Sequence, residues 1–280
     1  MINLELLNTA EIEASVRVAL DEDIGSGDLT AGLVSNEPIS ARLICREQAI
    51  LSGRPWFEAC FDMLDGSISI DWLLDDGDQM QSNDAVCRIR GSARPILTAE
   101  RTAINFLQTL SGVATATKQY VDAVAGTGCK ILDTRKTVPG LRKAVKYAVS
   151  CGGGHNHRVG LYDAVLIKEN HIHAAGSICQ VLKLASAGID PNVMIEIEVE
   201  NIEQLSEAIE CGASRVLLDN FSLSALPEAV KMAGDRVETE VSGNVTLENV
   251  NSIARCGVNF ISIGALTKHI NATDFSLLFT

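Results

Sequence analysis

From Cys129 onward, short aliphatic runs alternate with helix-like segments, and this alternation constrains the fold more than any other feature of the chain. Six runs rich in aliphatic and β-branched residues have the length of strands, at 129–133, 163–168, 192–200, 214–219, 237–241 and 258–264. Segments with a 3.6-residue period separate them, at 139–150, 177–187, 202–211, 223–233 and 247–256. Alternation with short loops predicts parallel strands joined by right-handed crossovers.

Polar side chains or loop glycines follow nearly every predicted strand, at 133–136, 168–171, 198, 219–220, 242–244 and 264–265. A closed barrel brings the C-terminal ends of all its strands to one mouth, where such residues meet. An open doubly wound sheet would separate the first and last strand ends, and no G-x-G-x-x-G motif follows the first strand. The sequence therefore predicts a parallel α/β barrel, incomplete because six strands are counted where eight are usual.

The chain before residue 113 has a different pattern. A helical period covers 10–20, strand-like runs follow at 41–47, 49–53, 67–74 and 85–91, and a long helix is expected at 97–110. This predicts a smaller N-terminal α+β domain over residues 1–112 and a barrel domain over 113–269. Residues 270–280 are a candidate to pack with the N-terminal domain.

The composition bears on where such a chain works. No apolar run approaches the roughly 20 residues that span a bilayer, and the amphipathic, acidic N-terminus is unlike a signal or transit peptide. The eight cysteines are scattered without a C-x-x-C pair, so a disulfide framework or zinc site has little support. We expect a cytoplasmic enzyme without a membrane segment, with most cysteines reduced and packed in apolar stretches.

The net charge of −13 argues against broad nucleic-acid binding, but the charge is uneven. Between Cys129 and His173, eight basic residues accompany three acids, so this island carries +5 and the rest of the chain −18. A basic island in an acidic protein suits the capture of a small anion. For Arg142, Lys143 and Lys146, a solvated helix face is the competing interpretation.

Within the island, three places are candidate anion anchors. Arg135 and Lys136 follow the first strand, where arginine can grip a carboxylate with two parallel hydrogen bonds and lysine acts as a point charge. The glycine-rich loop 151–158 ends in His157 and Arg158, although a lone histidine is often structural. Lys168 ends the second strand and could alternatively form a Schiff base, as in aldolases.

Carboxylates follow on the next two strands. Glu196, Glu198 and Glu200 alternate, so they face one side of their strand. Carboxylates that face a barrel interior repel one another unless Mg²⁺, a developing positive charge or lysine partners neutralise them. Glu198 and Asp219, from adjacent strands, form the expected carboxylate pair, with exposed surface glutamates as the alternative, chiefly for Glu200.

Small residues end the last two strands, at 242–244 and 264–265. Their backbone N–H groups precede predicted helices, and α/β barrels often hold phosphate after their last two strands. We predict a phosphate site there.

Together these segments resemble the quinolinate phosphoribosyltransferase family. The resemblance rests on DTRKTVPGLRKAVKYAV, GGGHNHRVGLYDAVLIKENH, IEVEN, LLDNF, EVSGNVT and ISIGALTKH, with EDIGSGDLT and ERTAINFLQTLSGVAT nearer the N-terminus. It implies an N-terminal α/β sandwich domain and an incomplete, seven-stranded barrel. The implied reaction transfers phosphoribosyl from phosphoribosyl pyrophosphate to quinolinate with decarboxylation, giving nicotinate mononucleotide, pyrophosphate and CO₂ in NAD biosynthesis.

The resemblance also implies residue roles. The quinolinate carboxylates would be held by Thr134, Arg135, His157, Arg158 and Lys168. Arg101 would reach in from the partner subunit of a homodimer. Lys136, Glu198 and Asp219 would act near the ribose and the diphosphate, and Glu198 and Asp219 would hold Mg²⁺. The 5′-phosphate would lie at Ser242, Gly243, Asn244, Gly264 and Ala265. One departure is SGN, since many members have SGG; asparagine also tolerates left-handed backbone geometry.

Three rival functions remain open. A Schiff-base lyase would use Lys168 as nucleophile, and a non-catalytic binder of phosphoribosyl pyrophosphate would keep only the phosphate site. A related transferase for a different pyridine or carboxylate acceptor would share most of the motifs.

Overall fold

The computed structural model describes residues 2–279, which form two compact units. Unit 1 comprises the chain up to Lys118, residues 137–153 and the chain from Ala265 onward, and unit 2 comprises residues 119–136 and 154–264. The long helix α3 (Ala93–Ala123) passes from one unit into the other, and the predicted domain boundary at 112/113 falls inside it.

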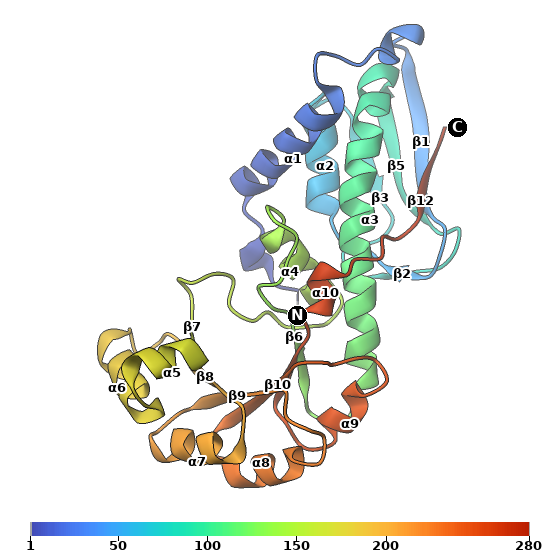
Figure 1. The fold of residues 1–280 in the computed structure, drawn as a ribbon. Coiled ribbons are helices and arrows are strands. Elements are labelled where there is room, and N and C mark those ends of the chain that lie inside the picture. Colours follow the sequence, from blue (N-terminus) through green and yellow to red (C-terminus); the bar gives the residue numbers. More distant parts are fainter. Residues whose placement is uncertain (1, 280) are drawn as a thin grey trace. The chain divides into compact units, whose positions relative to one another are not determined.

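Unit 2 is built on one six-stranded parallel sheet (Figure 1). Every predicted strand is found, as β6 (Lys130–Leu132), β7 (Val165–Ile167), β8 (Ile195–Val199), β9 (Arg215–Asp219), β10 (Glu238–Ser242) and β11 (Phe260–Ser262). The strand order is β6-β11-β10-β9-β8-β7. Successive strands from β7 to β11 are neighbours, and the last pairs with the first, β6, as in a barrel. The predicted incomplete barrel is therefore confirmed.

The barrel lacks a full seventh strand in the described part of the chain. Beside β6, a single parallel bridge joins Leu132 to His155. The His155 N–H donates to the Ile131 carbonyl at 2.8 Å, and the His155 carbonyl accepts from the Asp133 N–H at 3.1 Å. The seventh position that the resemblance implies is thus occupied by one residue of the glycine-rich loop.

Helices cover the outer side of this sheet, where Figure 1 shows α6, α7 and α8. The helices of unit 2 after β7 are α5 (Glu169–Ala175), α6 (Ile178–Gly188), α7 (Ile202–Glu210), α8 (Leu226–Ala233) and α9 (Val250–Ala254). Asn201 begins α7 by accepting a hydrogen bond from the Gln204 N–H. On β8, buried Ile197 and Val199 alternate with Glu196 and Glu198, so the apolar face meets the helices and the acidic face lies inside the barrel.

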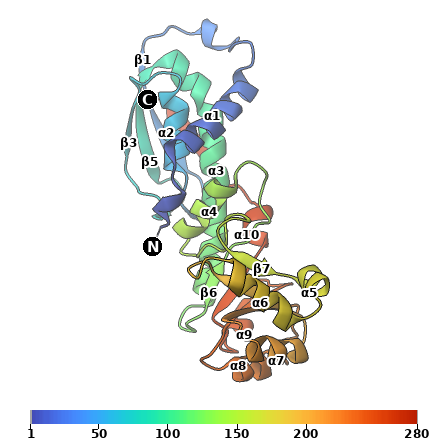
Figure 2. The ribbon, with the colours of Figure 1, turned by 90° about the vertical axis from the view of Figure 1, so that its left-hand side faces the viewer.

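Unit 1 is an α/β sandwich. Its antiparallel sheet has the order β12-β1-β5-β3, and a two-stranded sheet pairs β2 with β4. Figures 1 and 2 show α1, α2 and α3 on one face of the larger sheet. The elements are η1 (Leu4–Leu6), α1 (Thr9–Ile24), η2 (Ala31–Leu33), β1 (Pro38–Cys45), β2 (Ala49–Ile50), α2 (Arg54–Asp62), β3 (Ser69–Trp72), β4 (Gln79–Met80), β5 (Ala85–Ser92), α4 (Arg142–Cys151), α10 (Ala265–Lys268) and β12 (Phe275–Phe279).

Several elements differ from the sequence predictions. Helix α2, with Pro55 at its start, and the edge strand β12 are absent from the predicted elements. The segment after Lys168 forms α5, which is also absent from the predicted helices, and α3 is much longer than 97–110. Strand β12 pairs antiparallel with β1, across more than 200 residues of sequence.

The basic residues of α4 do not share one environment. Lys143 forms an ion pair with Glu11 on α1, with N···O distances of 2.6 and 2.7 Å. Lys146 is fully buried, so the interpretation of a solvated helix face is wrong for this residue. Among residues 2–279, no helix has the length and apolarity needed to cross a membrane.

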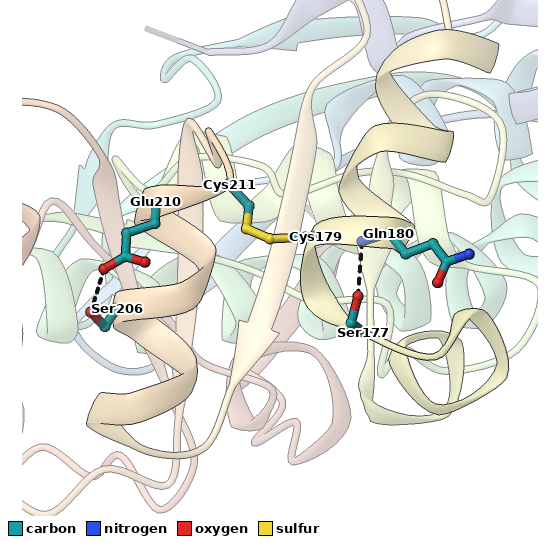
Figure 3. The surroundings of a disulfide bond; sticks show 6 residues. All are labelled: Ser177, Cys179, Gln180, Ser206, Glu210 and Cys211. Atoms are coloured by element: carbon teal, nitrogen blue, oxygen red, sulfur yellow. Dashed lines mark hydrogen bonds between the residues drawn. A yellow bond between two sulfur atoms is a disulfide. The ribbon is translucent and has the colours of Figure 1, made fainter.

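Most cysteines follow the prediction, and one pair does not. Six are free thiols, and five of these are buried. Cys179, near the start of α6, and Cys211, just after α7, form a disulfide on the outer side of unit 2 (Figure 3). This single disulfide is no framework, and no sequence pattern indicates it because its partners lie 32 residues apart.

Candidate active site

The predicted site residues, except Arg101 and Ala265, lie in unit 2 at or beyond the C-terminal ends of its strands. Parallel strands bring these ends to one side of the sheet, so the structure gathers residues that are distant in sequence. Arg101 is exposed on α3, and Ala265 begins the short helix α10; both belong to unit 1.

After β6, the chain turns so that Lys136 passes over a glycine. The Thr134 hydroxyl oxygen accepts a hydrogen bond from the Lys136 N–H at 3.0 Å. A Cβ atom added to Gly264 would lie only 3.1 Å from the Lys136 Cδ atom and 3.5 Å from the Thr134 hydroxyl. The glycine therefore makes room for Lys136, and the ends of β6 and β11 are in contact.

Asp133 fixes the glycine-rich loop to the end of β6. Its carboxylate is fully buried and accepts from the His157 N–H at 2.9 Å and from the Asn156 side-chain amide at 2.6 Å. These two bonds hold His157 and Arg158 beside the strand end, although three consecutive glycines lie earlier in the loop.

His157 contacts protein groups through both ring nitrogens. Its Nε2 atom lies 2.8 Å from a Glu196 carboxylate oxygen, and its Nδ1 atom accepts from the Arg158 N–H at 2.7 Å. The side chain is nearly buried. A direct contact between His157 and a substrate carboxylate, as predicted, would need one of these two bonds to open.

Glu196 belongs to a group of charged side chains inside the barrel, which we call the buried cluster: His157, Glu196, Arg215 and Glu240. Arg215 donates to Glu196 at 3.2 Å and to Glu240 at 2.5 Å. Both carboxylates have 0% exposure. The Arg215 guanidinium also lies 3.9 Å above the Phe260 ring. This cation lies between two buried carboxylates and pairs with both of them.

The two carboxyl groups of the buried cluster differ in acidity. Burial and the negative charge of Glu196 raise the pKa of Glu240 to about 7. Burial alone would raise the pKa of Glu196 as well, but the hydrogen bond from His157 and the charge of Arg215 hold it below its usual value. Glu196 is thus the carboxylate that stays ionised.

A second group, which we call the strand-end group, lies further along the same strands and consists of Lys168, Glu198, Asp219 and Ser242. Lys168 directly follows β7 and forms an ion pair with Glu198 on β8, with an N···O distance of 2.5 Å. The Lys168 side chain is 48% exposed, whereas that of Glu198 is 15% exposed. Lysine partners are one predicted way to neutralise the carboxylates of β8, and Lys168 is such a partner for Glu198.

Asp219, at the end of β9, is held by neutral groups. One carboxylate oxygen accepts from the Ser242 hydroxyl at 2.8 Å, and the other accepts from the Asn220 side-chain amide at 2.9 Å. Because neither donor carries a charge, these contacts orient the carboxylate without neutralising its negative charge.

Arg158 and Arg135 influence each other electrostatically. Burial and, secondly, the positive charge of Arg135 lower the pKa of Arg158. Arg158 also donates to the Ala164 carbonyl at 3.2 Å, which fixes its side chain. Two guanidinium groups that repel each other favour an anion between them.

The loop after β10 has the backbone geometry expected from its composition. Gly243 has a φ of 94° and Asn244 a φ of 52°, both in the left-handed region. The side-chain amide of Asn249 donates to the Asn244 carbonyl at 3.0 Å and closes the loop. Asparagine in place of the second glycine of SGG is therefore compatible with this turn, as predicted.

A cavity of about 280 Å³ adjoins the end of β8. Its lining is acidic, with Glu169, Glu198 and Glu200 beside His173 and Gln204. Such a lining repels carboxylates and phosphates, so the anchors for an anionic substrate are the cations on the neighbouring strand ends and not this cavity.

Sequence reasoning missed Arg215 and Glu240, and it identified Asn220 only as a polar residue after a strand, without a role. Glu240 could have been found from the sequence. In VETEV, Glu238 and Glu240 alternate and share a face, which is the pattern that identified the glutamates of β8. Arg215 carries no local signal, because a basic residue at the start of a strand is usually exposed.

Comparison with known proteins decides the family. Residues 28–111 match the family described as "Quinolinate phosphoribosyl transferase, N-terminal domain", and residues 113–278 match its C-terminal domain. The chain belongs to the quinolinate phosphoribosyltransferase family. The predicted family and the prediction of a transferase enzyme are therefore confirmed.

Individual relatives cover nearly the whole chain. "Probable nicotinate-nucleotide pyrophosphorylase [carboxylating]" of Bacillus subtilis is 39% identical over 91% of this chain and 89% of its own length. The chloroplastic "Nicotinate-nucleotide pyrophosphorylase [carboxylating]" of Arabidopsis thaliana is also 39% identical, over 96% of this chain and 82% of its own. The solved structure of the nicotinate-nucleotide pyrophosphorylase from Francisella tularensis is 45% identical, with a TM-score of 0.96 and 98% of each chain covered.

Proposed function

We propose that the strand ends of unit 2 transfer the phosphoribosyl group of phosphoribosyl pyrophosphate to the ring nitrogen of quinolinate. The products are nicotinate mononucleotide, pyrophosphate and CO₂. The observation that carries the proposal is the meeting of cations and carboxylates at one end of a single parallel sheet, where Glu198 pairs with Lys168 and Asp219 is held by neutral donors. Cations suit a dianionic acceptor, and carboxylates suit a sugar carbon that becomes positively charged.

Quinolinate is held by Arg135, Arg158 and Lys168, with Thr134 and His157 beside them. Burial and, secondly, the positive charge of Arg135 lower the pKa of Arg158, and the repulsion between the two guanidinium groups supports an anion between them. Binding the dicarboxylate relieves this repulsion. It also aligns the ring nitrogen with the sugar carbon, which lowers the entropic part of the barrier.

Glu198 and Asp219 stabilise the ribose as its bond to pyrophosphate breaks. The largely buried Glu198 and the oriented Asp219 are fixed before the reaction, so they stabilise positive charge with little reorganisation. Lys136 lies on the diphosphate side. When the ring nitrogen bonds to the sugar carbon, pyrophosphate leaves with the electron pair of the broken bond.

Decarboxylation follows from the positive charge on the ring nitrogen. The carboxylate on the carbon next to this nitrogen leaves as CO₂, and its bonding electrons pass to that ring carbon, where the adjacent cationic nitrogen stabilises them. A proton then replaces the carboxylate. The other carboxylate stays in the product and keeps its contact with the anchors.

Mg²⁺ fits the residues that we assign to it. Glu198 and Asp219 offer hard oxygen ligands from adjacent strand ends, and Mg²⁺ is commonly held by one or two carboxylates together with substrate phosphates. The neutral donors around Asp219 leave its charge available. In the buried cluster, by contrast, a metal ion would compete with Arg215 for Glu196 and Glu240. Bound Mg²⁺ would neutralise charge on the leaving diphosphate.

The 5′-phosphate binds to the loops after β10 and β11, at Ser242, Gly243, Asn244, Gly264 and Ala265. The left-handed turn at 243–244 supports this assignment, because such turns direct backbone N–H groups toward an anion. The enzyme works as a cytoplasmic homodimer, in which Arg101 of one subunit completes the quinolinate site of the other. The exposure of Arg101 on α3 is compatible with such a contact.

The contacts of Lys168 weigh against the Schiff-base lyase. Its side-chain nitrogen is held in an ion pair with Glu198, whereas a Schiff-base lysine must present this nitrogen to a carbonyl carbon. A binder without catalysis would bind phosphoribosyl pyrophosphate and release no pyrophosphate.

The deciding experiment incubates the protein with quinolinate, phosphoribosyl pyrophosphate and Mg²⁺. Nicotinate mononucleotide, pyrophosphate and CO₂ are expected in equal amounts. Omission of Mg²⁺ tests the metal assignment, and nicotinate in place of quinolinate tests the acceptor. Product from nicotinate but not from quinolinate would overturn the proposal in favour of the related transferase.

A further inference from the structure

Asn220 is the residue after β9, and its backbone has an uncommon geometry. Its φ is 55°, in the left-handed region that asparagine tolerates better than most side chains. Its N–H donates to the Ser242 carbonyl at 3.1 Å, which extends the pairing of β9 with β10 by one bond. The turn therefore places the Asn220 side chain between the end of β9 and the loop after β10.

The amide nitrogen of this side chain faces Asp219. It donates to one carboxylate oxygen at 2.9 Å, while the Ser242 hydroxyl donates to the other at 2.8 Å. With one donor on each oxygen, the plane of the Asp219 carboxylate is fixed.

The amide oxygen of Asn220 faces the phosphate loop. A Cβ atom at Gly243 would lie only 2.2 Å from this oxygen, so no other residue fits at 243 while Asn220 keeps its position. The Asn244 side-chain amide lies 3.4 Å from the same oxygen and donates to it. One exposed side chain thus contacts the proposed catalytic carboxylate and two residues of the proposed phosphate loop.

We propose that Asn220 is a positioning residue that couples the Asp219 carboxylate to the 5′-phosphate loop. Its amide N–H holds Asp219 toward the sugar carbon, and its amide oxygen keeps Gly243 and Asn244 in register with that carboxylate. Binding of the phosphate and stabilisation of the ribose charge are then linked through one amide. This inference rests on the proposed function, which gives Asp219 and the loop these two roles.

A purely structural asparagine would behave differently on substitution. If only the left-handed backbone mattered, glycine and aspartate would both replace it, because both adopt this conformation. If the amide N–H matters, glycine removes the donor, and aspartate places a second negative charge against Asp219. Both variants would then fail, and aspartate would be the worse.

The test measures steady-state kinetics and quinolinate binding for Asn220→Gly, Asn220→Asp and Asn244→Gly. For Asn220→Gly we expect kcat/KM for phosphoribosyl pyrophosphate to fall about 10- to 100-fold, the effect of losing a hydrogen bond to a charged group. The Kd for quinolinate should stay within about twofold, because the anchors Arg135, Arg158 and Lys168 are untouched; unchanged binding also reports that the variant is folded. Asn244→Gly, which removes only the 3.4 Å bond, should raise the KM for phosphoribosyl pyrophosphate by a few-fold.

Asn83→Gly is the matched control, since Asn83 also has a left-handed φ of 72° but lies in a turn of unit 1. It should leave all kinetic constants unchanged. If the wild type is active and the kcat/KM of Asn220→Gly or Asn220→Asp lies within twofold of the wild-type value, the coupling is overturned. The proposed function then stays intact. A wild-type chain that makes no nicotinate mononucleotide overturns the proposed function and, with it, this inference.

Discussion

The buried cluster and the strand-end group lie on the same strands of unit 2, yet their charges are compensated in opposite ways. On β8, Glu196 is fully buried between His157 and Arg215, whereas Glu198, two residues later, is partly exposed and meets a half-exposed lysine. On β9, Arg215 serves as a cation for two carboxylates, and Asp219 is held only by neutral donors among the contacts described above.

The difference shows how one barrel separates stability from chemistry. Charges in the interior must be paired, because an unpaired buried charge costs several kcal/mol. Charges at the strand ends are partly exposed, so they need less compensation from the protein and can act on a substrate. We therefore expect substitutions in the buried cluster to change mainly stability, and substitutions in the strand-end group to change mainly turnover.

The largest expected effect is the loss of stability in Arg215→Met. Methionine keeps much of the side-chain volume but leaves Glu196 and Glu240 without their shared cation. Breaking a buried pair in this way costs about 3–5 kcal/mol. Urea unfolding followed by circular dichroism measures the free energy of unfolding. Lys168→Met is the matched control; its half-exposed pair should contribute about 1 kcal/mol or less. Equal losses in the two variants would break the comparison.

A large effect on turnover is expected for Glu198→Gln. The amide keeps the shape of the carboxylate but cannot stabilise the positive charge on the ribose, so kcat should fall about 10²- to 10³-fold, the range seen when a preorganised stabilising group is removed. The free energy of unfolding should change by about 1 kcal/mol or less. Glu200→Gln on the same strand end is the control, because Glu200 is exposed. A Glu198→Gln enzyme that turns over normally would remove Glu198 from the catalytic assignment.

Part of the fold and of the site could be predicted from the sequence alone. The six strands were predictable because runs such as SRVLLD and NVMIEIEVE are local patterns, and the position of Glu198, Asp219 and Ser242 at strand ends follows from parallel pairing. Their roles, in contrast, came from the family resemblance.

The remaining features depend on contacts that no local pattern encodes. Strand β12 pairs with β1 through a register set by tertiary packing, and Cys179 meets Cys211 only because α6 and α7 lie side by side. Arg215 looks like a surface residue until the neighbouring strands place Glu196 and Glu240 on either side of it. Short helices such as α2 and α5 have too few turns for a clear period.

A moderate, pH-dependent effect is expected at Glu240. Its pKa is raised from 4.5 to about 7 in the folded protein, so between these values the folded state binds a proton that the unfolded state has released. The free energy of unfolding should therefore decrease as pH rises from about 5 to 7.

Glu240→Gln removes the group that binds this proton. The decrease in the free energy of unfolding between about pH 5 and 7 should therefore be smaller in this variant, by about 1–3 kcal/mol. Urea unfolding of both proteins at pH 5, 6, 7 and 8 measures the difference. Glu238→Gln is the control, since Glu238 is exposed on the same strand. Parallel pH profiles for wild type and Glu240→Gln would show that the buried cluster does not hold the proton.

The smallest expected effects come from one substitution made on two neighbouring strands. Ser242→Ala removes one of the two donors to Asp219, so kcat/KM for phosphoribosyl pyrophosphate should fall about tenfold, since a hydrogen bond to a charged group contributes about 1.5 kcal/mol. Ser262→Ala on β11 removes a buried hydroxyl that hydrogen-bonds Glu240, and it should lower the free energy of unfolding by about 1 kcal/mol while turnover stays within about twofold. Kinetics and urea unfolding of both variants give four values. If Ser262→Ala lost activity and Ser242→Ala lost only stability, the division between the buried cluster and the strand-end group would be reversed.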